Sequence, residues 1–419
     1  MPRSPHLAEL DRLLALRWET RIVPGLERIR KALNYLGHPE RSFPSVLVLG
    51  TNGKGSTAAF LASLLRAAGL KVGLYTSPHL VREEERIMVD GQPIASQQLL
   101  DWVKALARFP ELSYFETLTA TAFGVFAEAH VDLAVVEAGL GGRWDATNAK
   151  DHEVALLTNV GTDHQAWLGP TREQIAAEKA AAIRGRFGIL GQWDPGLLPV
   201  IRAYAHPDTP LTPASTWAQV ETVDESFGLF PTVWVACCGH RFQVTLPLAG
   251  DFQRENYQLA LAGLAALVDC QLVPHPSLPS LLAGTSATRW PGRLEQVTWR
   301  GKSLLLDGAH NREAVEAVVG TLRLAGFCGK LDLIFSCLAD KPLPAMAALL
   351  RPLVRRVTVV ALTSPRSRPL QELAAAFPGC QQAPSVAAAL ELADSEITTL
   401  VTGSLRLVGE VKALLKETL

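Results

Sequence analysis

The residues with the plainest chemical meaning in this 419-residue chain form a glycine-rich stretch after an apolar run. Val46–Leu49 is typical of a buried strand, and Gly50–Thr57 (GTNGKGST) follows it directly. Glycines let backbone N–H groups surround phosphate oxygens, and Lys54 would place a positive charge at the terminal phosphates. Ser56 or Thr57 would reach a magnesium ion. The stretch predicts a nucleoside triphosphate site, and the competing interpretation is an ordinary link between a strand and a helix.

Two positions depart from the usual phosphate-loop pattern, which has an early glycine and places Ser or Thr directly after the lysine. Here the early position is Val48, and Gly55 separates Lys54 from Ser56. A lysine between two glycines is a poor helix start unless an anion lies there. We therefore interpret the stretch as a specialised nucleotide loop.

Other candidate residues stand where predicted parallel strands end, which is the edge at which open α/β sheets bind ligands. Glu137 follows the apolar run 131–136, and a carboxylate one strand away from the phosphate loop is placed to hold magnesium. Ser77 lies just past the run 72–76 and would add a hydroxyl to the metal. The competing interpretation of Glu137 is a charge that caps a strand end, and that of Ser77 is a plain Ser-Pro turn.

Two further strand ends combine a carboxylate with an imidazole. Asp163 and His164 stand on the loop after the predicted strand 154–158. Asp307 and His310 follow an apolar run in the C-terminal third of the chain. Such pairs suit metal, ribose, phosphate or substrate contacts, although a single histidine is more often structural. Because Lys54 and other strand-end residues are expected at the same sheet edge, we favour the functional interpretation of these pairs.

Strands that alternate with helices position these residues, a pattern typical of a mostly parallel sheet covered on both faces. The predicted helices of the first part of the chain are 7–37, 56–68, 97–108, 116–129, 171–184 and 256–268. The predicted strands there are 46–49, 72–76, 131–136 and 154–158. An alternating run at 241–246, within residues about 190–250, indicates a small antiparallel sheet.

A boundary is predicted near Trp290–Arg293. Beyond it we expect a hairpin over about 294–306 and then strands at 331–337, 356–362 and 399–402, separated by helices. The fold class is therefore α/β with two domains. Residues 1–290 would form an ATP-binding domain with a phosphate loop, helices on both faces of a parallel sheet, and the small antiparallel sheet. Residues 291–419 would form a smaller Rossmann-like domain.

The composition excludes several classes of protein. Hydrophobic residues make up 48% of the chain and charged residues 19%, which allows a sizeable core. Forty basic and 41 acidic side chains leave a net charge of −1, so neither nucleic acid nor a membrane surface is expected as a partner. No apolar run approaches the roughly 18 residues that cross a bilayer, and Met1–His6 lacks the apolar core of a signal peptide. Six cysteines without a CxxC pair indicate free thiols in a reducing compartment, so we expect a cytoplasmic protein.

Ten motifs, taken in chain order, carry a resemblance to a known family. They are Gly50–Thr57, Thr76–Leu80 (TSPHL), Glu85-Arg86, Phe115–Thr119 (FETLT), Glu137–Asn148 (EAGLGGRWDATN), Thr158–His164 (TNVGTDH), Glu178-Lys179, Pro291–Arg293, Asp307–Asn311 (DGAHN) and Thr402–Glu410 (TGSLRLVGE). Together they resemble the folylpolyglutamate synthases and dihydrofolate synthases, a branch of the Mur ligase superfamily. The resemblance implies ATP-dependent ligation of L-glutamate to dihydropteroate and to reduced folates through an acyl phosphate, with release of ADP and phosphate.

The resemblance also implies roles for individual residues. The expected catalytic residues are Lys54, Lys179 and His310. The expected ATP contacts are Gly50, Thr51, Asn52, Gly53, Lys54, Gly55, Ser56, Thr57, Asn256, Arg293 and Asp307. The expected substrate contacts are Ser77, Pro78, His79, Phe115, Glu116, Thr117, Leu118, Trp144, Asp145, Ala146, His310 and Ser404. The expected ligands of two magnesium ions are Ser77, Glu137, His164 and Lys179, the last as a carbamate.

Four positions depart from the family's usual pattern. Trp144, Ala181, Phe252 and Pro342 stand where Leu, Gly, His and Asp are more common. These departures concern contacts to the pterin and the adenine rather than the class of reaction.

The choice of acceptor stays open at this point. The Trp144-Asp-Ala segment and the compact length favour a bifunctional enzyme over one that extends folates only. A cell-wall ligase acting on a UDP-linked substrate is a further alternative, against which Gly55 and the Ser77-Pro-His segment argue. From another class, a nucleotide-dependent regulatory protein would not need Asp307, His310 and Ser404 to converge on the same cleft. We expect a monomer whose two domains close around that cleft to exclude water.

Overall fold

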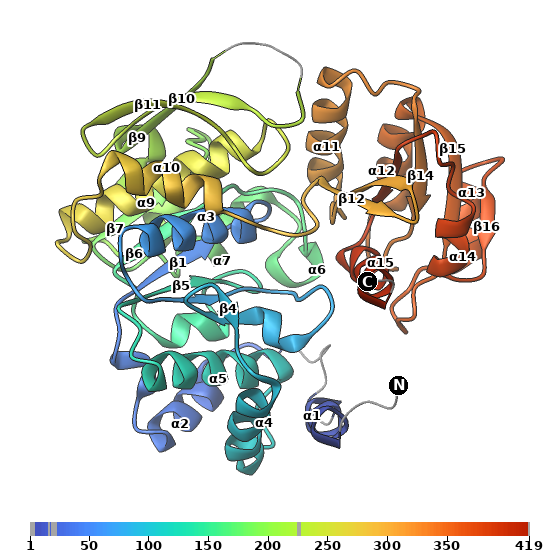
Figure 1. The fold of residues 1–419 in the computed structure, drawn as a ribbon. Coiled ribbons are helices and arrows are strands. Elements are labelled where there is room, and N and C mark those ends of the chain that lie inside the picture. Colours follow the sequence, from blue (N-terminus) through green and yellow to red (C-terminus); the bar gives the residue numbers. More distant parts are fainter. Residues whose placement is uncertain (1–4, 16, 18–22, 224–227, 418–419) are drawn as a thin grey trace.

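The structure, a computed structural model, describes residues 5–15, 17, 23–223 and 228–417 (Figure 1). Residues 16 and 18–22 of the predicted helix 7–37 lie outside the described residues, as do residues 1–4 of the segment considered for a signal peptide. On either side of this gap the chain forms two helices, α1 (Pro5–Ala15) and α2 (Glu27–Tyr35).

The larger sheet has eight strands in the order β4-β3-β2-β5-β1-β6-β7-β8. Six neighbouring strands, β2, β5, β1, β6, β7 and β8, run parallel, while β3 and β4 add an antiparallel edge. In chain order the strands are β1 (Ser45–Leu49), β2 (Val72–Tyr75), β3 (Ile87–Val89), β4 (Gln92–Pro93), β5 (Leu133–Glu137), β6 (Val154–Leu157), β7 (Phe187–Leu190) and β8 (Leu211–Pro213). The predicted parallel sheet is present.

Side chains of the central strands alternate between two hydrophobic cores. Val46 and Val48 of β1 face one core, and Leu47 and Leu49 face the other. The first core is covered by α3 (Lys54–Ala67), α9 (Gln253–Asp269) and α10 (Leu278–Ala287). The second is covered by α1, α2, α4 (Ser96–Ala105), α5 (Tyr114–Glu128), α7 (Arg172–Ala180) and α8 (Leu198–Tyr204). Helices therefore cover both faces, as the apolar strand runs predicted.

A small antiparallel sheet packs over α9, in the order β11-β10-β9. Its strands are β9 (Ala218–Thr222), β10 (Thr232–Cys237) and β11 (His240–Thr245). The predicted region of about 190–250 is thus only partly antiparallel, because it also contains the helix α8 and the strand β8, which joins the larger sheet.

The C-terminal part of the chain forms a six-stranded sheet in the order β12-β13-β17-β14-β15-β16. The hairpin of β12 (Glu295–Trp299) and β13 (Lys302–Leu306) is antiparallel, and the other pairs are parallel. The remaining strands are β14 (Leu331–Phe335), β15 (Val354–Val360), β16 (Gln381–Ala383) and β17 (Thr399–Thr402). We use "N-terminal part" for α1 to α10 and "C-terminal part" for β12 to α15.

Helices also cover both faces of this sheet (Figure 1). One face packs against α11 (Arg312–Leu324), α12 (Leu343–Leu350) and α13 (Leu370–Ala376). The other packs against α14 (Val386–Glu391) and α15 (Leu405–Glu417). Short 3₁₀ turns complete the chain: η1 (Pro39–Arg41), η2 (Glu83–Arg86), η3 (Leu106–Arg108), η4 (Ala146–Ala149), η5 (Ala214–Thr216) and η6 (Arg351–Leu353).

Several predicted boundaries shift by a few residues. The helix expected at 56–68 begins earlier, at Lys54, and Glu137 is the last residue of β5 rather than the residue after it. The helix expected over 171–184 ends at Ala180. None of the helices among the described residues is both long and apolar enough to cross a membrane.

All six cysteines are free thiols. Three are buried and two are partly buried, whereas Cys328 is exposed. Half of these thiols are therefore buried.

Candidate active site

The phosphate loop connects β1 to α3 through a backbone that glycine adopts most easily. Gly50 and Gly53 have positive φ angles of 139° and 84°. A Cβ atom added at Gly53 would lie 2.2 Å from Asn256 Oδ1, so the loop packs closely against α9. The segment after β6 holds the loop from another side, where Asn52 N donates to Asn159 Oδ1 at 3.0 Å. The predicted nucleotide loop and Asn256 are thus brought together.

Two lysine side chains meet at one carbonyl of this loop. Lys54 Nζ donates to Gly50 O and Thr51 O, both at 3.1 Å, and Lys179 Nζ donates to Gly50 O at 2.8 Å. Lys179 is 3% exposed, and its burial, followed by the charge of Lys54, lowers its pKa to about 7. Among the described residues neither ammonium forms an ion pair with a carboxylate. Amino groups without a carboxylate partner, beside a glycine-rich turn, fit an anion such as a polyphosphate.

The first turn of α3 packs inward. The Ser56 hydroxyl accepts from Gln253 Nε2 at 3.4 Å. Thr57 Oγ1 is buried and has no hydrogen-bond partner among the described residues. Gly55 lies against the indole of Trp290, where an added Cβ would meet ring atoms at 2.8 to 3.0 Å. The glycine that interrupts the usual loop pattern therefore makes room for an indole ring.

The carboxylate of Glu137 is buried at the end of β5, beside the phosphate loop. Glu137 pairs with Val48 in the parallel register of β5 and β1. Its Oε2 accepts from Ser77 N at 3.0 Å, and burial raises its pKa against the opposing charge of Lys54. It forms no ion pair with any described residue. Since a buried carboxylate without a counter-charge is costly, a cation at this position would be stabilising.

The segment after β2 turns through a cis peptide bond between Ser77 and Pro78. His79 Nδ1 accepts from Arg86 Nε at 3.0 Å, which fixes the orientation of the ring. Burial, followed by the charge of Arg86, lowers the pKa of His79 to about 3, so the imidazole is neutral near pH 7. The segment offers a hydroxyl group and a neutral imidazole to the cavity described next.

A cavity of about 710 Å³ is lined by residues of both the N-terminal and the C-terminal part. Many predicted residues line it: Ser77, Pro78, His79, Phe115, Glu116, Trp144, Asp145, Ala146, His164, His310 and Ser404. Other predicted residues do not: Lys54, Thr117, Leu118, Glu137, Lys179, Asn256, Arg293 and Asp307. Two sheets that are separate in sequence therefore build one concave site.

The four predicted residues of α5 serve different purposes. Phe115 and Glu116 line the cavity, while Thr117 and Leu118 are fully buried in the helix packing. Glu116 also caps its own helix, because its Oε2 accepts from Ser113 N at 2.8 Å. Its other oxygen accepts from Arg28 Nε at 3.1 Å. Both carboxylate oxygens of Glu116 are thus already engaged.

Two half-exposed tryptophans line the same cavity. Trp144 is 50% exposed and Trp167 is 53% exposed. Asp145, next to the first, is buried and accepts from Leu140 N at 2.7 Å and Thr147 N at 3.0 Å. Burial raises the pKa of Asp145, and these hydrogen bonds oppose that shift. Open aromatic faces beside fixed polar groups suit a planar heterocyclic ligand.

Asp307 shapes the loop that follows β13. Its Oδ2 accepts from Leu294 N at 2.9 Å, and its Oδ1 accepts from Ala309 N at 2.8 Å. Burial raises its pKa against the charge of Arg293. Arg293 in turn donates from Nη1 to Gly292 O at 3.1 Å. Arg293 and Asp307, both expected ATP contacts, therefore lie close together on the connection into the C-terminal part.

His310 and Ser404 reach the cavity from two loops of the C-terminal part. His310 Nδ1 donates to Gly308 O at 2.8 Å, and its other ring nitrogen, Nε2, lies 3.6 Å from Asp163 Oδ2. The Ser404 hydroxyl accepts from Arg406 N at 3.1 Å at the start of α15. Both side chains are thus held in place by their own loops.

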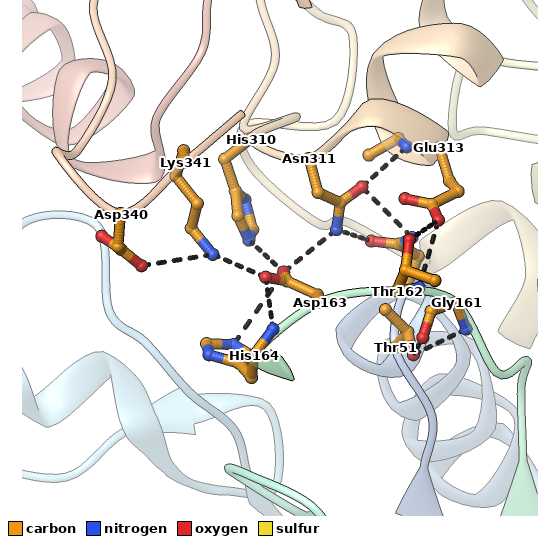
Figure 2. A network of polar contacts seen from close by, with 12 residues as sticks. Thr51, Gly161, Thr162, Asp163, His164, His310, Asn311, Glu313, Asp340 and Lys341 are labelled. Carbon is orange, nitrogen blue, oxygen red and sulfur yellow. Dashed lines mark hydrogen bonds and ion pairs between the residues drawn. The ribbon is translucent and has the colours of Figure 1, made fainter. Parts of the chain in front are cut away.

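His164 begins α6 (Gln165–Leu168) with a positive φ of 57°. Burial lowers its pKa to about 4, and the neighbouring Asp163 partly offsets this shift. Asp163 itself contacts His310, Asn311 and Lys341 of the C-terminal part (Figure 2).

The fold also brings to the site four residues for which the sequence predicted no role: Asn159, Trp167, Asn311 and Lys341. Asn159 and Asn311 belong to the motifs Thr158–His164 and Asp307–Asn311, and Lys341 directly precedes Pro342. Their partners lie far away in the chain, so no local pattern could reveal them.

No three His, Cys, Asp or Glu side chains gather as a metal-binding group among the described residues. The predicted ligand set does not require such a group, because it includes the Ser77 hydroxyl and a modified Lys179. The buried Glu137 carboxylate, with one backbone N–H as its partner, fits a cation that also takes phosphate oxygens as ligands.

The chain matches two family models. The Mur ligase middle domain matches residues 48–186, and the Mur ligase glutamate ligase domain matches residues 292–405. Among curated relatives, a dihydrofolate synthase/folylpolyglutamate synthase of Mycobacterium tuberculosis is 34% identical over 404 residues. That alignment covers 88% of this chain and 81% of the relative.

Solved structures show the same likeness over almost the whole chain. Escherichia coli FolC in complex with DHPP and ADP has a TM-score of 0.87 at 31% identity, and the match covers 99% of both chains. A bifunctional folylpolyglutamate synthase/dihydrofolate synthase with Mn, AMPPNP and L-glutamate bound has a TM-score of 0.82 at 31% identity. That match covers 99% of this chain and 98% of the other.

Proposed function

The chain belongs to the dihydrofolate synthase/folylpolyglutamate synthase family of Mur ligases, and on this premise we propose which of its residues carry out ATP-dependent ligation of glutamate to folates. The family and the α/β fold expected from the motifs are both confirmed. The observation that carries the assignment of residues is the shared cavity, which His310 and Ser404 line from one part and Ser77 and Trp144 from the other.

We propose that the acceptor's pterin ring binds beside Trp144 and Phe115 and that its carboxylate points toward the phosphate loop. Half-exposed aromatic side chains supply flat apolar surface for a ring, and the buried Asp145 fixes the segment that carries Trp144. The Escherichia coli relative in complex with DHPP and ADP supports a second small-molecule ligand beside the nucleotide.

We propose that Gly50–Thr57, Asn256, Arg293 and Asp307 bind ATP. An acceptor carboxylate oxygen attacks the γ-phosphorus, the bond to the β–γ bridging oxygen breaks, and ADP leaves. Lys54 and the loop N–H groups would stabilise the negative charge that shifts onto the leaving oxygen. The glutamate nitrogen then attacks the acyl carbon, the carbon–oxygen bond to phosphate breaks, and the nitrogen loses a proton as the amide forms.

We place the incoming glutamate near His310 and Ser404. His310 lines the cavity, and its Nε2 lies 3.6 Å from Asp163 Oδ2, so Asp163 would orient the imidazole toward the amine. The short distance between reacting groups would supply much of the acceleration, and enclosure between the two parts would protect the acyl phosphate from water.

We propose two magnesium ions, held by Ser77, Glu137, His164 and Lys179 together with phosphate oxygens. When bound, such ions supply charge neutralisation at the transferring phosphoryl group. The relative with Mn and AMPPNP bound supports a divalent metal in this family. Lys179 would take part as a carbamate, since its lowered pKa leaves a neutral amine able to combine with CO₂ near pH 7.

We infer that the chain is bifunctional and adds glutamate to dihydropteroate as well as to reduced folates. The experiment compares the two acceptors with purified protein, ATP and L-glutamate, and measures phosphate release and product mass. Turnover with both is expected. Turnover with tetrahydrofolate alone would reduce the assignment to folylpolyglutamate synthase, and turnover with a UDP-linked acceptor would favour the cell-wall alternative.

Three further features complete the proposal. We propose a cytoplasmic location, supported by the free thiols. We propose a domain boundary between residues 290 and 291, supported by the connection between α10 and β12. We propose a monomer, supported by a cavity that residues of a single chain line from both sides. A mass near 45.2 kDa in light scattering would be the expected result for the last point.

A further inference from the structure

One carboxylate connects the N-terminal part to three side chains of the C-terminal part (Figure 2). Asp163 Oδ1 lies 2.9 Å from Lys341 Nζ, and Asp163 Oδ2 accepts from Asn311 Nδ2 at 3.1 Å. His310 Nε2 lies 3.6 Å from the same Oδ2 atom. Asp163 stands on the segment after β6, whereas its partners stand on the loops after β13 and β14.

The ion pair at the centre of this network is nearly enclosed. The Lys341 side chain is 5% exposed and that of Asp163 is 11% exposed. A buried pair of this kind depends on the presence of both members, because either charge left alone is costly.

Neighbouring hydrogen bonds tie the same loops to the phosphate loop. Asn311 Nδ2 also donates to Asn52 Oδ1 at 2.9 Å, and Asn311 Oδ1 accepts from Ala314 N at 2.8 Å. Asn311 therefore caps α11 while it contacts the nucleotide loop. A second link runs alongside, because Thr162 Oγ1 donates to Glu313 Oε1 at 2.6 Å.

The pair also lies at the edge of the catalytic cavity. Lys341, His164 and His310 all line that cavity, and each has a nitrogen within 4.0 Å of an Asp163 oxygen. Loss of Asp163 would therefore remove one shared restraint from all three side chains.

We propose that Asp163 and Lys341 are a positioning pair that holds the C-terminal part against the phosphate loop and fixes His164 and His310 across the cavity. The pair acts through other residues and is not itself placed at the reacting atoms. The kinetic part of this inference rests on the proposed ligase function, while its conformational part does not.

The test uses the full chain and the variants Lys341→Met, Asp163→Asn and their combination. Small-angle X-ray scattering with ADP would measure the radius of gyration, and steady-state kinetics would measure kcat and the KM for glutamate. We expect each single variant to increase the radius of gyration and to lower kcat/KM for glutamate by about tenfold or more. The double variant should be little worse than either single variant, because the two residues act together.

The matched control is Lys412→Met, which removes a 2.6 Å pair with Glu295 inside the C-terminal part. It should change neither the radius nor the KM. Lys341→Arg, which keeps the charge, should restore compactness and keeps the test decisive if Lys341→Met does not fold.

Two results would overturn the proposal. Lower activity of Lys341→Met at an unchanged radius would mean that Lys341 contacts substrate directly. Unchanged radius and kinetics with a lower melting temperature would mean that the pair only stabilises the fold. Absence of turnover in the wild-type chain would instead count against the proposed function, and the scattering comparison would still decide the conformational question.

Discussion

The charges around the Gly50 carbonyl are arranged for a ligand that the chain itself does not supply. Lys54 and Lys179 both donate to this oxygen, and neither amino group has a carboxylate partner among the described residues. Glu137 shows the reverse situation, a buried carboxylate without an ion pair in the same part of the structure. A polyphosphate with its cations would compensate both.

Replacement of Lys54 by alanine tests the role of that ammonium. Because it would neutralise charge that develops on the phosphates, we expect Lys54→Ala to lower kcat by roughly 10²–10³-fold, about 3–4 kcal/mol of transition-state stabilisation. The measurement is initial-rate ADP release at saturating ATP. A loss confined to the KM for ATP would show that Lys54 contributes to binding alone.

His310 allows a sharper separation of binding from chemistry. We expect His310→Ala to lower turnover by roughly 10²-fold, a typical contribution of a positioned acid or base. ATP binding should remain largely intact, because His310 contacts Gly308 and Asp163 rather than the residues of the phosphate loop. Calorimetric titration with ADP and glutamate kinetics measure the two effects. Unchanged glutamate ligation would remove His310 from the mechanism.

The carbamate on Lys179 can be observed directly. The pKa of about 7 means that the neutral amine is the minor form below pH 7 and the major form above it. At constant dissolved ¹³CO₂, the carbamate signal in ¹³C NMR should therefore grow as pH rises through 7 and decline as pH falls. Lys179→Met should lack this signal at every pH. A wild-type spectrum identical to that of the variant would exclude the modification.

At the scale of elements, the start of α3 depends on a residue far away in the chain. Gly55 has room only for hydrogen because the Trp290 indole lies against it. The sequence showed the glycine as an irregularity in a known pattern, but it could not show the ring that requires it.

A pair of glycine substitutions tests this packing. Gly55→Ala would force the indole aside, at a cost of about 1–3 kcal/mol. Gly320 in α11 is the matched control, since an added Cβ there meets nothing within 4 Å, and Gly320→Ala should stabilise its helix by up to about 1 kcal/mol. Thermal unfolding with and without ADP compares the two. Equal upward shifts in melting temperature would contradict the packing explanation.

The elements that the sequence predicted well are those with a local signal. The apolar runs of β1, β5, β6 and β17 lie within a residue or two of their predicted positions, because buried parallel strands are continuously apolar. The short strands β3, β4, β8 and β16 were missed, since two to three residues carry too little pattern, and the four-residue strand β7 was missed as well. The 7–37 helix was predicted as one element although Pro24 and Gly25 precede α2.

At the scale of the whole molecule, the active site exists only because two sheets meet. Their positions at strand ends predicted that Glu137, His164 and His310 would lie in one binding cleft. His164 and His310 line the cavity, and Glu137 does not. The role of Asp163 and Lys341 could not be predicted, because their pairing depends on how the C-terminal part lies against the N-terminal part. Likewise, Thr117 and Leu118 share a motif with Phe115, yet the helix turns them into the core.

In the proposed reaction, ATP activates an acceptor carboxylate before glutamate attacks it. The direct measurement uses dihydropteroate with ¹⁸O in its carboxylate, together with ATP, L-glutamate and purified protein, and analyses the released phosphate and the product by mass spectrometry. We expect a product with one added glutamate, and one ¹⁸O atom transferred into each phosphate. Product formed with unlabelled phosphate would contradict the acyl-phosphate route, and no product from dihydropteroate or tetrahydrofolate would contradict the proposed function itself.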